Sequence, residues 1–222
     1  MLVVQNLSKE FTRDGRRRRL FRNLSFSLAP SERLAVLGRN GQGKSTLIKI
    51  LGGVIAPTSG QVRWSMTASW PLGFGGAFQG SLTGIDNVRF LARIYDRPAT
   101  QMLALVENFA ELGDALTMPV KHYSSGMRAR LAFGMSLAIE FDCYLIDEVI
   151  AVGDIVFRNR CESELFEKRA SRSFIIASHD MNFLRSTCNR AVLIESGQAT
   201  LYPDLEQAIE IYEQIGSTAH GI

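Results

Sequence analysis

The chain has few of the residues that form disulfides, bind metal ions or cross membranes. Its 222 residues include three cysteines, Cys143, Cys161 and Cys188, and three histidines. An odd number of widely spaced cysteines fits neither a disulfide framework nor a zinc site, so we expect buried or free thiols in a reducing compartment. Because no stretch of about eighteen apolar residues occurs, we expect no membrane-spanning helix. The N-terminal residues lack the basic and apolar regions of a signal peptide, so we expect none.

An excess of charge of one sign is also missing. The 25 Lys and Arg residues nearly balance the 22 Asp and Glu residues, and the formal net charge of +3 is too small to indicate a nucleic-acid binder. Hydrophobic residues make up 46% and charged residues 21%, which is typical of a globular protein able to bury a core. The local exception is Arg16–Arg19, which could contact phosphates or anionic lipid headgroups, although a solvated hairpin is the commoner explanation.

The apolar pattern predicts strands and helices in alternation. Short apolar runs predict strands at 2–5, 24–28, 33–37, 143–147, 173–177 and 191–195, and the last four have the continuous pattern of buried parallel strands. Helical patterns lie near 45–52, 86–95, 100–112, 126–139, 155–170, 181–188 and 204–215. The alternation predicts an α/β sheet with covered faces, and the helical stretch from about 85 to 134 predicts a subdomain inserted into it. Residues 71–84 contain five glycines and are expected to form a long loop.

Residues 38–45 match the phosphate-binding pattern G-x-x-x-x-G-K-[ST] between an apolar run and a helical segment. Backbone N–H groups of a glycine loop at a helix N-terminus can surround a triphosphate, and side chains at Gly41 and Gly43 would obstruct its approach. We expect Lys44 to contact the β- and γ-phosphates and the Ser45 hydroxyl to bind Mg²⁺. The predicted nucleotide-binding residues are Gly38, Arg39, Asn40, Gly41, Gln42, Gly43, Lys44, Ser45 and Thr46.

Two acidic residues follow the apolar run at 143–146. Asp147, at the end of a buried strand, is placed to hold Mg²⁺ or its water shell. Glu148 would then reach the water that attacks the γ-phosphate, as a general base or a polarising group. An Asp-Glu pair alone more often marks a solvated turn.

Ser124, Ser125 and Gly126 precede a strong helical pattern and could form both an N-cap and an anion site, although a well-capped helix is the commoner explanation when these residues stand alone. His179 follows a predicted strand and could donate to a γ-phosphate from its end. A lone histidine is more often structural.

These motifs occur in the order found in ABC-transporter ATPases, and the resemblance covers essentially the whole chain. It implies a P-loop NTPase core of the α/β class with an antiparallel β subdomain and an inserted helical subdomain. Residues 1–222 would be one ATP-binding domain, with its core at about 1–84 and 135–222 and its helical subdomain at about 85–134. The resemblance also implies hydrolysis of ATP with Mg²⁺ and a head-to-tail dimer, in which Ser124 and Gly126 of one copy contact the γ-phosphate held by the other.

The resemblance further implies roles for three single residues. Asp154 resembles the residue that couples the two sites, His179 resembles the switch histidine, and Phe11 resembles the aromatic that stacks on adenine, although a core aromatic is the alternative. Lys44, Glu148 and His179 would form the catalytic group, with Ser45 and Asp147 at the metal.

The sequence departs from the family pattern in two places. The signature Tyr123–Met127 differs from the usual L-S-G-G-Q at three of five positions. The position of the family's Q-loop glutamine falls near Phe74, so Gln79 receives no metal or water role.

Residues 70–78, 123–137 and 149–154 resemble the exporters of bacterial surface polysaccharides, most closely the capsular branch. This implies a motor for capsular polysaccharide export at the cytoplasmic face of the inner membrane, held there by a separate transmembrane permease. The loop at 71–84 and the helical region after it are the expected contact with that permease, with a flexible surface loop as the alternative.

Other functions remain open at this point. They are an O-antigen or teichoic-acid exporter ATPase, a soluble ABC ATPase acting on nucleic acid, a regulatory module that binds ATP without turnover, and a small-molecule kinase. A nucleic-acid ABC protein would usually carry two cassettes or a large insertion, so no nucleic-acid partner is expected. A kinase has no use for Ser124–Gly126.

Overall fold

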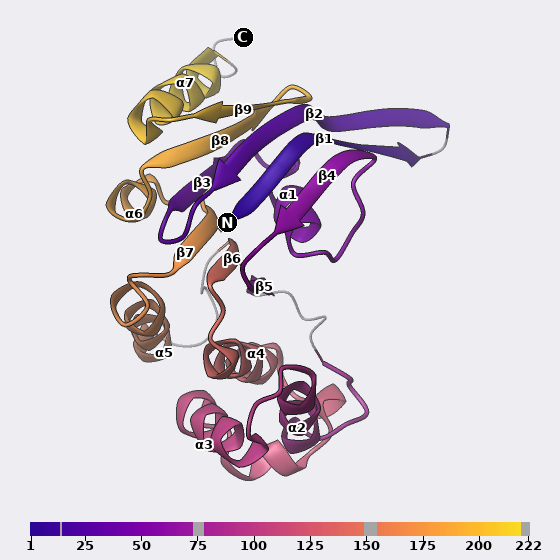
Figure 1. The fold of residues 1–222 in the computed structure, drawn as a ribbon, viewed down its shortest axis with the longest axis vertical. Helices are drawn as coiled ribbons and strands as arrows, with labels where there is room; N and C mark the ends of the chain where they lie inside the picture. Colours follow the sequence, from indigo (N-terminus) through magenta and orange to yellow (C-terminus); the bar gives the residue numbers. More distant parts are fainter. Residues whose placement is uncertain (14, 73–77, 149–154, 219–222) are drawn as a thin grey trace. The chain divides into compact units, whose positions relative to one another are not determined.

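The computed structural model describes residues 1–13, 15–72, 78–148 and 155–218 (Figure 1). These residues form two compact units. Unit 1 comprises Met1–Pro71, Asp142–Glu148 and Ser171–Ile222, and unit 2 comprises Leu72–Phe141 and Val149–Ala170. Within the described ranges, no helix combines the length and the apolar character that a membrane crossing requires.

The larger sheet of unit 1 has the strand order β5-β6-β7-β3-β8-β9. Its strands are β3 (Arg33–Leu37), β5 (Ala68–Leu72), β6 (Cys143–Asp147), β7 (Ser173–Ala177), β8 (Arg190–Glu195) and β9 (Gln198–Tyr202). The β6–β7, β7–β3 and β3–β8 pairs are parallel, whereas β8 and β9 form an antiparallel pair. The four continuously apolar runs therefore form parallel strands, as predicted, and every residue of β7 is buried.

A second sheet has the order β2-β1-β4 and is antiparallel throughout. Its strands are β1 (Leu2–Arg13), β2 (Arg16–Leu28) and β4 (Ser59–Trp64). Both β1 and β2 run well beyond the predicted apolar segments, because their backbones remain paired to the tip, where Arg13 lies opposite Arg16. Backbone pairing needs no apolar side chain, so the apolar pattern marks only the buried half of this hairpin.

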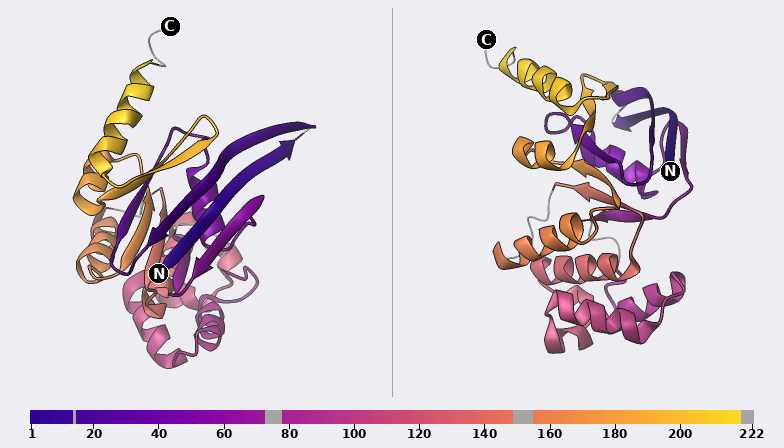
Figure 2. Two further views of the ribbon diagram at one scale, coloured as in Figure 1. Left: turned by 45° about the horizontal axis from the view of Figure 1, so that its top comes forward. Right: turned by 60° about the vertical axis from the view of Figure 1, so that its left-hand side comes forward.

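The helices of unit 1 are α1 (Lys44–Leu51), α6 (Met181–Thr187) and α7 (Leu205–Thr218). Leu47, Ile48, Ile50 and Leu51 of α1 belong to one buried cluster together with residues of both sheets. Figure 1 shows α1 behind β1 and β4, and Figure 2 shows the same elements from two further sides. The loop at residues 38–43 therefore precedes a helix that is buried between the two sheets.

Unit 2 is helical. It contains α2 (Gly84–Ile94), α3 (Ala99–Ala110), α4 (Ser125–Ile139), α5 (Ile155–Glu162), the short 3-10 turns η2 (Gly113–Thr117) and η3 (Val120–His122), and the π-helical turn η4 (Ser163–Glu167). The helical pattern at 155–170 thus forms an α-helix that continues into a π turn. The inserted helical subdomain and the antiparallel sheet expected for the fold class are both present.

Candidate functional site

The predicted phosphate loop connects β3 to α1. Gly38 lies so close to β8 that a Cβ atom there would be 2.5 Å from the backbone oxygen of Ile194. Gly43 caps α1 with a φ of 119°, a left-handed conformation that favours glycine. A Cβ on Gly43 would also be 3.2 Å from two side-chain atoms of Leu20. These two glycines are therefore required by the chain's own packing.

Lys44 is buried at the start of α1, with 5% of its surface exposed. Its Nζ donates to the backbone oxygen of Gly38 at 2.7 Å and lies 3.2 Å from Nε2 of His179. Burial lowers the pKa of Lys44, and the carboxylates of Glu148 and Asp147 oppose that effect. The two carboxylates thus favour the charged form of Lys44, and an ammonium group in the first turn of a helix is suited to bind phosphate.

Asp147 ends β6, directly beside the last residue of β7 in the parallel register. Burial raises the pKa of its carboxyl, although a hydrogen bond with the Ser45 side chain and the nearby ammonium groups of Lys49 and Lys44 oppose the rise. Its Oδ1 is buried and has no hydrogen-bond partner in the part of the chain that the structure describes. An unsatisfied carboxylate oxygen beside a hydroxyl fits a hard divalent cation.

The described residues include no group of three or more His, Cys, Asp or Glu side chains that could hold a metal ion. Mg²⁺ commonly binds through one or two carboxylates together with substrate phosphates and water, rather than in an all-protein cage. The pairing of Ser45 with Asp147 fits that mode and does not fit a resident structural metal.

Glu148 and His179 meet where β6 and β7 end. Nε2 of His179 is 2.9 Å from Oε1 of Glu148, and both side chains are partly exposed. The backbone N–H of Glu148 donates to the oxygen of Ala177 at 2.9 Å, which anchors the residue to β7. Glu148 has a φ of 45°, a strained conformation for a residue other than glycine that is often found at functional sites.

A cavity of about 150 Å³ lies over the loop and reaches Glu148. Its lining residues are Leu20, Arg39, Asn40, Gly41, Gly43, Lys44, Ser45, Thr46 and Glu148. All of them belong to unit 1, so a single compact unit supplies the loop, the acidic pair and the histidine. Sequence reasoning missed Leu20, whose signal is its position as the first buried residue of β2 after four arginines.

Phe11 lies on β1 with 45% of its surface exposed, so it is not a core residue. Nζ of Lys9 lies 4.7 Å from the centroid of its ring. The alternative of a core aromatic is therefore wrong, and the role of Phe11 against adenine stays a prediction.

Ser124 caps α4 in unit 2, and its Oγ accepts a hydrogen bond from the N–H of Met127 at 3.2 Å. Ser124 and Ser125 are exposed, and Gly126 follows them in the first turn. Tyr123 is buried instead, and its hydroxyl donates to the oxygen of Ala115 at 2.5 Å. The predicted N-cap is therefore confirmed, and both serines remain exposed for a contact beyond their own helix.

Two predicted positions, Asp154 and Phe74, lie outside the described residues. Gln79 is tied to α2 by its backbone. Its N–H donates to Oδ1 of Asn87 at 2.9 Å, and Nδ2 of Asn87 donates to its oxygen at 3.2 Å. Asn87 is 2% exposed, so the backbone of Gln79 is held by hydrogen bonds to a buried side-chain amide.

Known proteins resemble this chain over nearly its full length. Residues 21–151 match the family described as ABC transporter. ATP-binding protein BexA of Haemophilus influenzae is 50% identical over 214 residues, 96% of this chain and 99% of the relative. The capsule polysaccharide export ATP-binding protein CtrD of Neisseria meningitidis serogroup B is 50% identical over 216 residues, 97% and 100% of the two chains.

Solved structures share the fold. A dimeric ATP-binding cassette in a post-hydrolysis state, bound to ADP and Pi, aligns with a TM-score of 0.71 at 19% identity and covers 90% of this chain and 96% of its own. The ATP-binding subunit of an ABC transporter aligns with a TM-score of 0.73 at 20% identity, covering 97% and 93%. At such identities the likeness shows the fold alone.

Proposed function

The chain belongs to the ABC transporter family as an ATP-binding domain, and we propose that it energises export of a bacterial capsular polysaccharide by hydrolysing ATP. The observation that carries the proposal is the convergence of Lys44, Glu148 and His179 at the carboxyl ends of neighbouring parallel strands. The name of one relative supports the transported class. Of the two relatives that are half identical to this chain, CtrD is named for capsule polysaccharide export, whereas BexA is named only as an ATP-binding protein.

Each residue around the loop has a role in phosphoryl transfer to water. The amides of residues 38–46 bind the phosphates, and Lys44 neutralises charge on the β- and γ-phosphates. Glu148 accepts a proton from the attacking water, and His179 orients Glu148 and contacts the γ-phosphate. Phe11 provides a face for the base. Ser45 and Asp147 would hold Mg²⁺, which would supply positive charge against the negative charge that develops on the phosphates.

A second copy of the chain would complete the site. Exposed Ser124 and Ser125, with Gly126, stand at the N-terminus of a 15-residue helix, where N–H groups favour an anion. In a head-to-tail dimer these residues close over the γ-phosphate held by the partner's loop, and Asp154 couples the two sites. ATP binding then draws the copies together, and hydrolysis weakens that closure.

A polytopic permease subunit would provide the membrane pore and hold the chain at the cytoplasmic face of the inner membrane as a peripheral protein. Residues 71–84 and the helical region after them would contact it. We also propose that residues 1–222 act as one ATP-binding domain, with a core at about 1–84 and 135–222 and a helical subdomain at about 85–134. A single cooperative unfolding transition would support this organisation, and two separated transitions would contradict it.

The test uses the chain alone and together with a permease from the same export system. Purified chain should hydrolyse ATP with Mg²⁺, and Lys44→Ala should abolish that activity. Co-expression with the permease should move the chain into the membrane pellet. Pelleting without the permease would contradict the partner-dependent attachment, and salt-sensitive binding of DNA or RNA would favour a nucleic-acid ATPase instead.

A further inference from the structure

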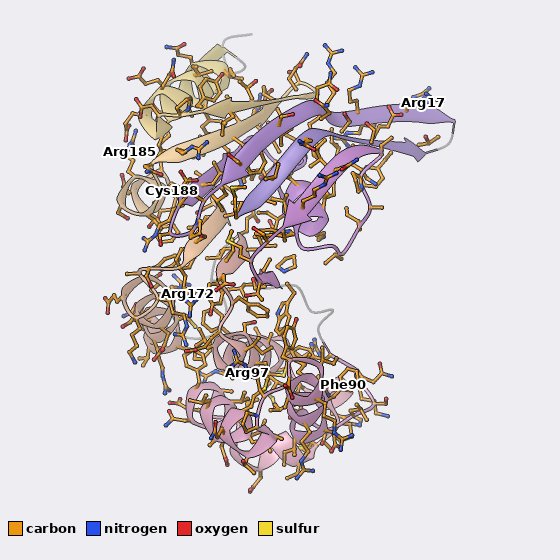
Figure 3. The ribbon with its side chains drawn as sticks, in the orientation of Figure 1. Arg17, Phe90, Arg97, Arg172, Arg185 and Cys188 are labelled. Atoms are coloured by element: carbon orange, nitrogen blue, oxygen red, sulfur yellow. The ribbon has the colours of Figure 1, made fainter. Side chains whose placement is uncertain are left out.

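The arginine run at the hairpin tip divides between two faces. Adjacent residues of a strand point to opposite faces, and residues directly opposite in an antiparallel pair share a face. Arg18 is paired with Phe11, whereas Arg17 is paired with Thr12. Arg18 therefore shares its face with Phe11, and Arg17, which Figure 3 labels near the tip of the hairpin, belongs to the other face.

Arg18 contacts the phosphate loop directly. Its Nη2 donates to the backbone oxygen of Gly41 at 2.8 Å. Leu20, two residues further along β2, lies so close to the loop that a Cβ on Gly43 would be 3.2 Å from its side chain. The hairpin thus contacts the loop at Gly41 and lies close to it at Gly43, and Phe11 shares the face of Arg18.

The contact with Gly41 fixes one peptide plane of the loop. The N–H of Gln42, in the same plane, donates to the oxygen of Arg39 at 3.2 Å. The plane between Gly41 and Gln42 is therefore held at both ends. Gly41 itself has a φ of 78°, and a glycine backbone can otherwise adopt many conformations. Holding this plane orders the loop before any phosphate arrives.

We propose that Arg18 is a positioning residue for the phosphate loop, which acts through the Gly41 carbonyl and so favours nucleotides that carry a β-phosphate. The inference rests on the proposed function, because it presumes that the loop binds a nucleotide. A loop ordered in advance loses less conformational freedom on binding, and an additional guanidinium charge beside the cavity attracts polyphosphate. Arginine suits this role because a guanidinium donates several hydrogen bonds in fixed directions.

The experiment compares Arg18→Ala with Arg17→Ala, which removes the same charge from the adjacent position on the opposite face. Affinities for ADP and AMP are measured by calorimetry at one ionic strength, so that turnover does not interfere. Arg18→Ala should weaken ADP binding by about three- to ten-fold, the size expected for one hydrogen bond. AMP affinity should change much less, and Arg17→Ala should leave the preference for ADP over AMP as in the wild type.

Amide hydrogen exchange without nucleotide provides a second measurement. Exchange at residues 40–43 should be faster in Arg18→Ala and unchanged in Arg17→Ala. Equal losses of ADP affinity in the two variants, or wild-type affinity and exchange in Arg18→Ala, would overturn the role of Arg18. Such an outcome for Arg18 would leave the proposed function intact, provided that the wild-type chain binds ADP and Lys44→Ala does not. A wild-type chain that binds no ADP would overturn both.

Discussion

Nε2 of His179 lies 2.9 Å from Oε1 of Glu148, and the same nitrogen lies 3.2 Å from Nζ of Lys44. One imidazole nitrogen donates when it carries a hydrogen and accepts when it does not. A protonated Nε2 therefore binds Glu148, and a bare Nε2 accepts from Lys44. The position of the hydrogen on this ring therefore decides whether His179 binds Glu148, the residue proposed to activate water, or Lys44, the residue proposed to hold phosphate.

Glu148→Gln should slow ATP hydrolysis by about 10²- to 10⁴-fold, the usual contribution of a general base. Glutamine retains the size of the side chain and can still bind His179, but it accepts no proton from water. Steady-state phosphate release measures the rate, and nucleotide binding, which should persist, serves as the control. Wild-type turnover in this variant would exclude Glu148 as the base.

Asp147→Asn should raise the thermal midpoint of the nucleotide-free protein at neutral pH while lowering Mg²⁺-dependent hydrolysis. Burial raises the pKa of Asp147 in the folded state, so the folded protein binds its proton more tightly than the unfolded chain does. At pH values above the raised pKa, the ionised carboxylate therefore lowers the free energy of unfolding. This loss becomes smaller as the pH falls toward the ordinary carboxyl pKa.

Calorimetric melting of Asp147→Asn and wild type across that acidic range tests the sign. The advantage of the asparagine variant should be largest near neutrality and should shrink on acidification. If the difference in thermal midpoint between Asp147→Asn and wild type grew as the pH fell, burial would not be the main influence on the pKa of Asp147.

Ser124→Ala should lower the free energy of unfolding by about 1 kcal/mol, because the variant loses the N-cap of α4. Thr83→Ala is the matched control. Thr83 caps α2 in the same unit, and its Oγ1 accepts from the N–H of Asp86 at 3.0 Å. Urea unfolding should show similar losses for the two variants.

Only Ser124→Ala should also weaken dimerisation driven by ATP, because only that cap is proposed to face the partner's nucleotide. Sedimentation of both variants in a Glu148→Gln background, where ATP persists, separates the two effects. Equal dimerisation by the two cap variants would leave Ser124 with a capping role alone.

Gly84→Ala should destabilise the helical unit by about 1–3 kcal/mol, as overpacking does in a filled core. A Cβ there would be 2.5 Å from the hydroxyl of Tyr123 and 2.9 Å from Cδ2 of Leu116. Because Tyr123 precedes the cap, hydrolysis should fall as well. Gly216→Ala in α7 is the control, since within the described residues a Cβ there meets no atom within 4 Å apart from its chain neighbours and the backbone of its own helix. A neutral Gly84→Ala would show that Tyr123 can move without cost.

The sequence predicted most elements because its apolar patterns report local burial. The runs at 33–37, 143–147 and 173–177 became strands with those same bounds. The antiparallel hairpin was predicted only in part, since β1 and β2 continue into polar residues that stay paired without burial. The phosphate loop was identified because its pattern lies within eight consecutive residues.

The positions of single side chains were harder to predict from the sequence. Family resemblance indicated His179, but its spacing from Lys44 along the chain says nothing about the 3.2 Å between their nitrogens. Arg18 appeared as one of four equivalent arginines, and only the register of β1 with β2 distinguishes it. An aromatic in the first strands is more often a core residue, and only the structure shows that Phe11 is exposed.

By itself, then, the sequence determined most of the strand and helix segments and the position of the phosphate-binding pattern at 38–45, because these properties depend on neighbours within a few residues. Tertiary structure alone decided that β7 lies between β6 and β3. That order brings Glu148 and His179 to the lysine of the loop, and the packing of β2 beside the loop brings Arg18 to Gly41. Such contacts join segments far apart in the chain, and they depend on which strands pair, a choice that local apolar patterns do not encode.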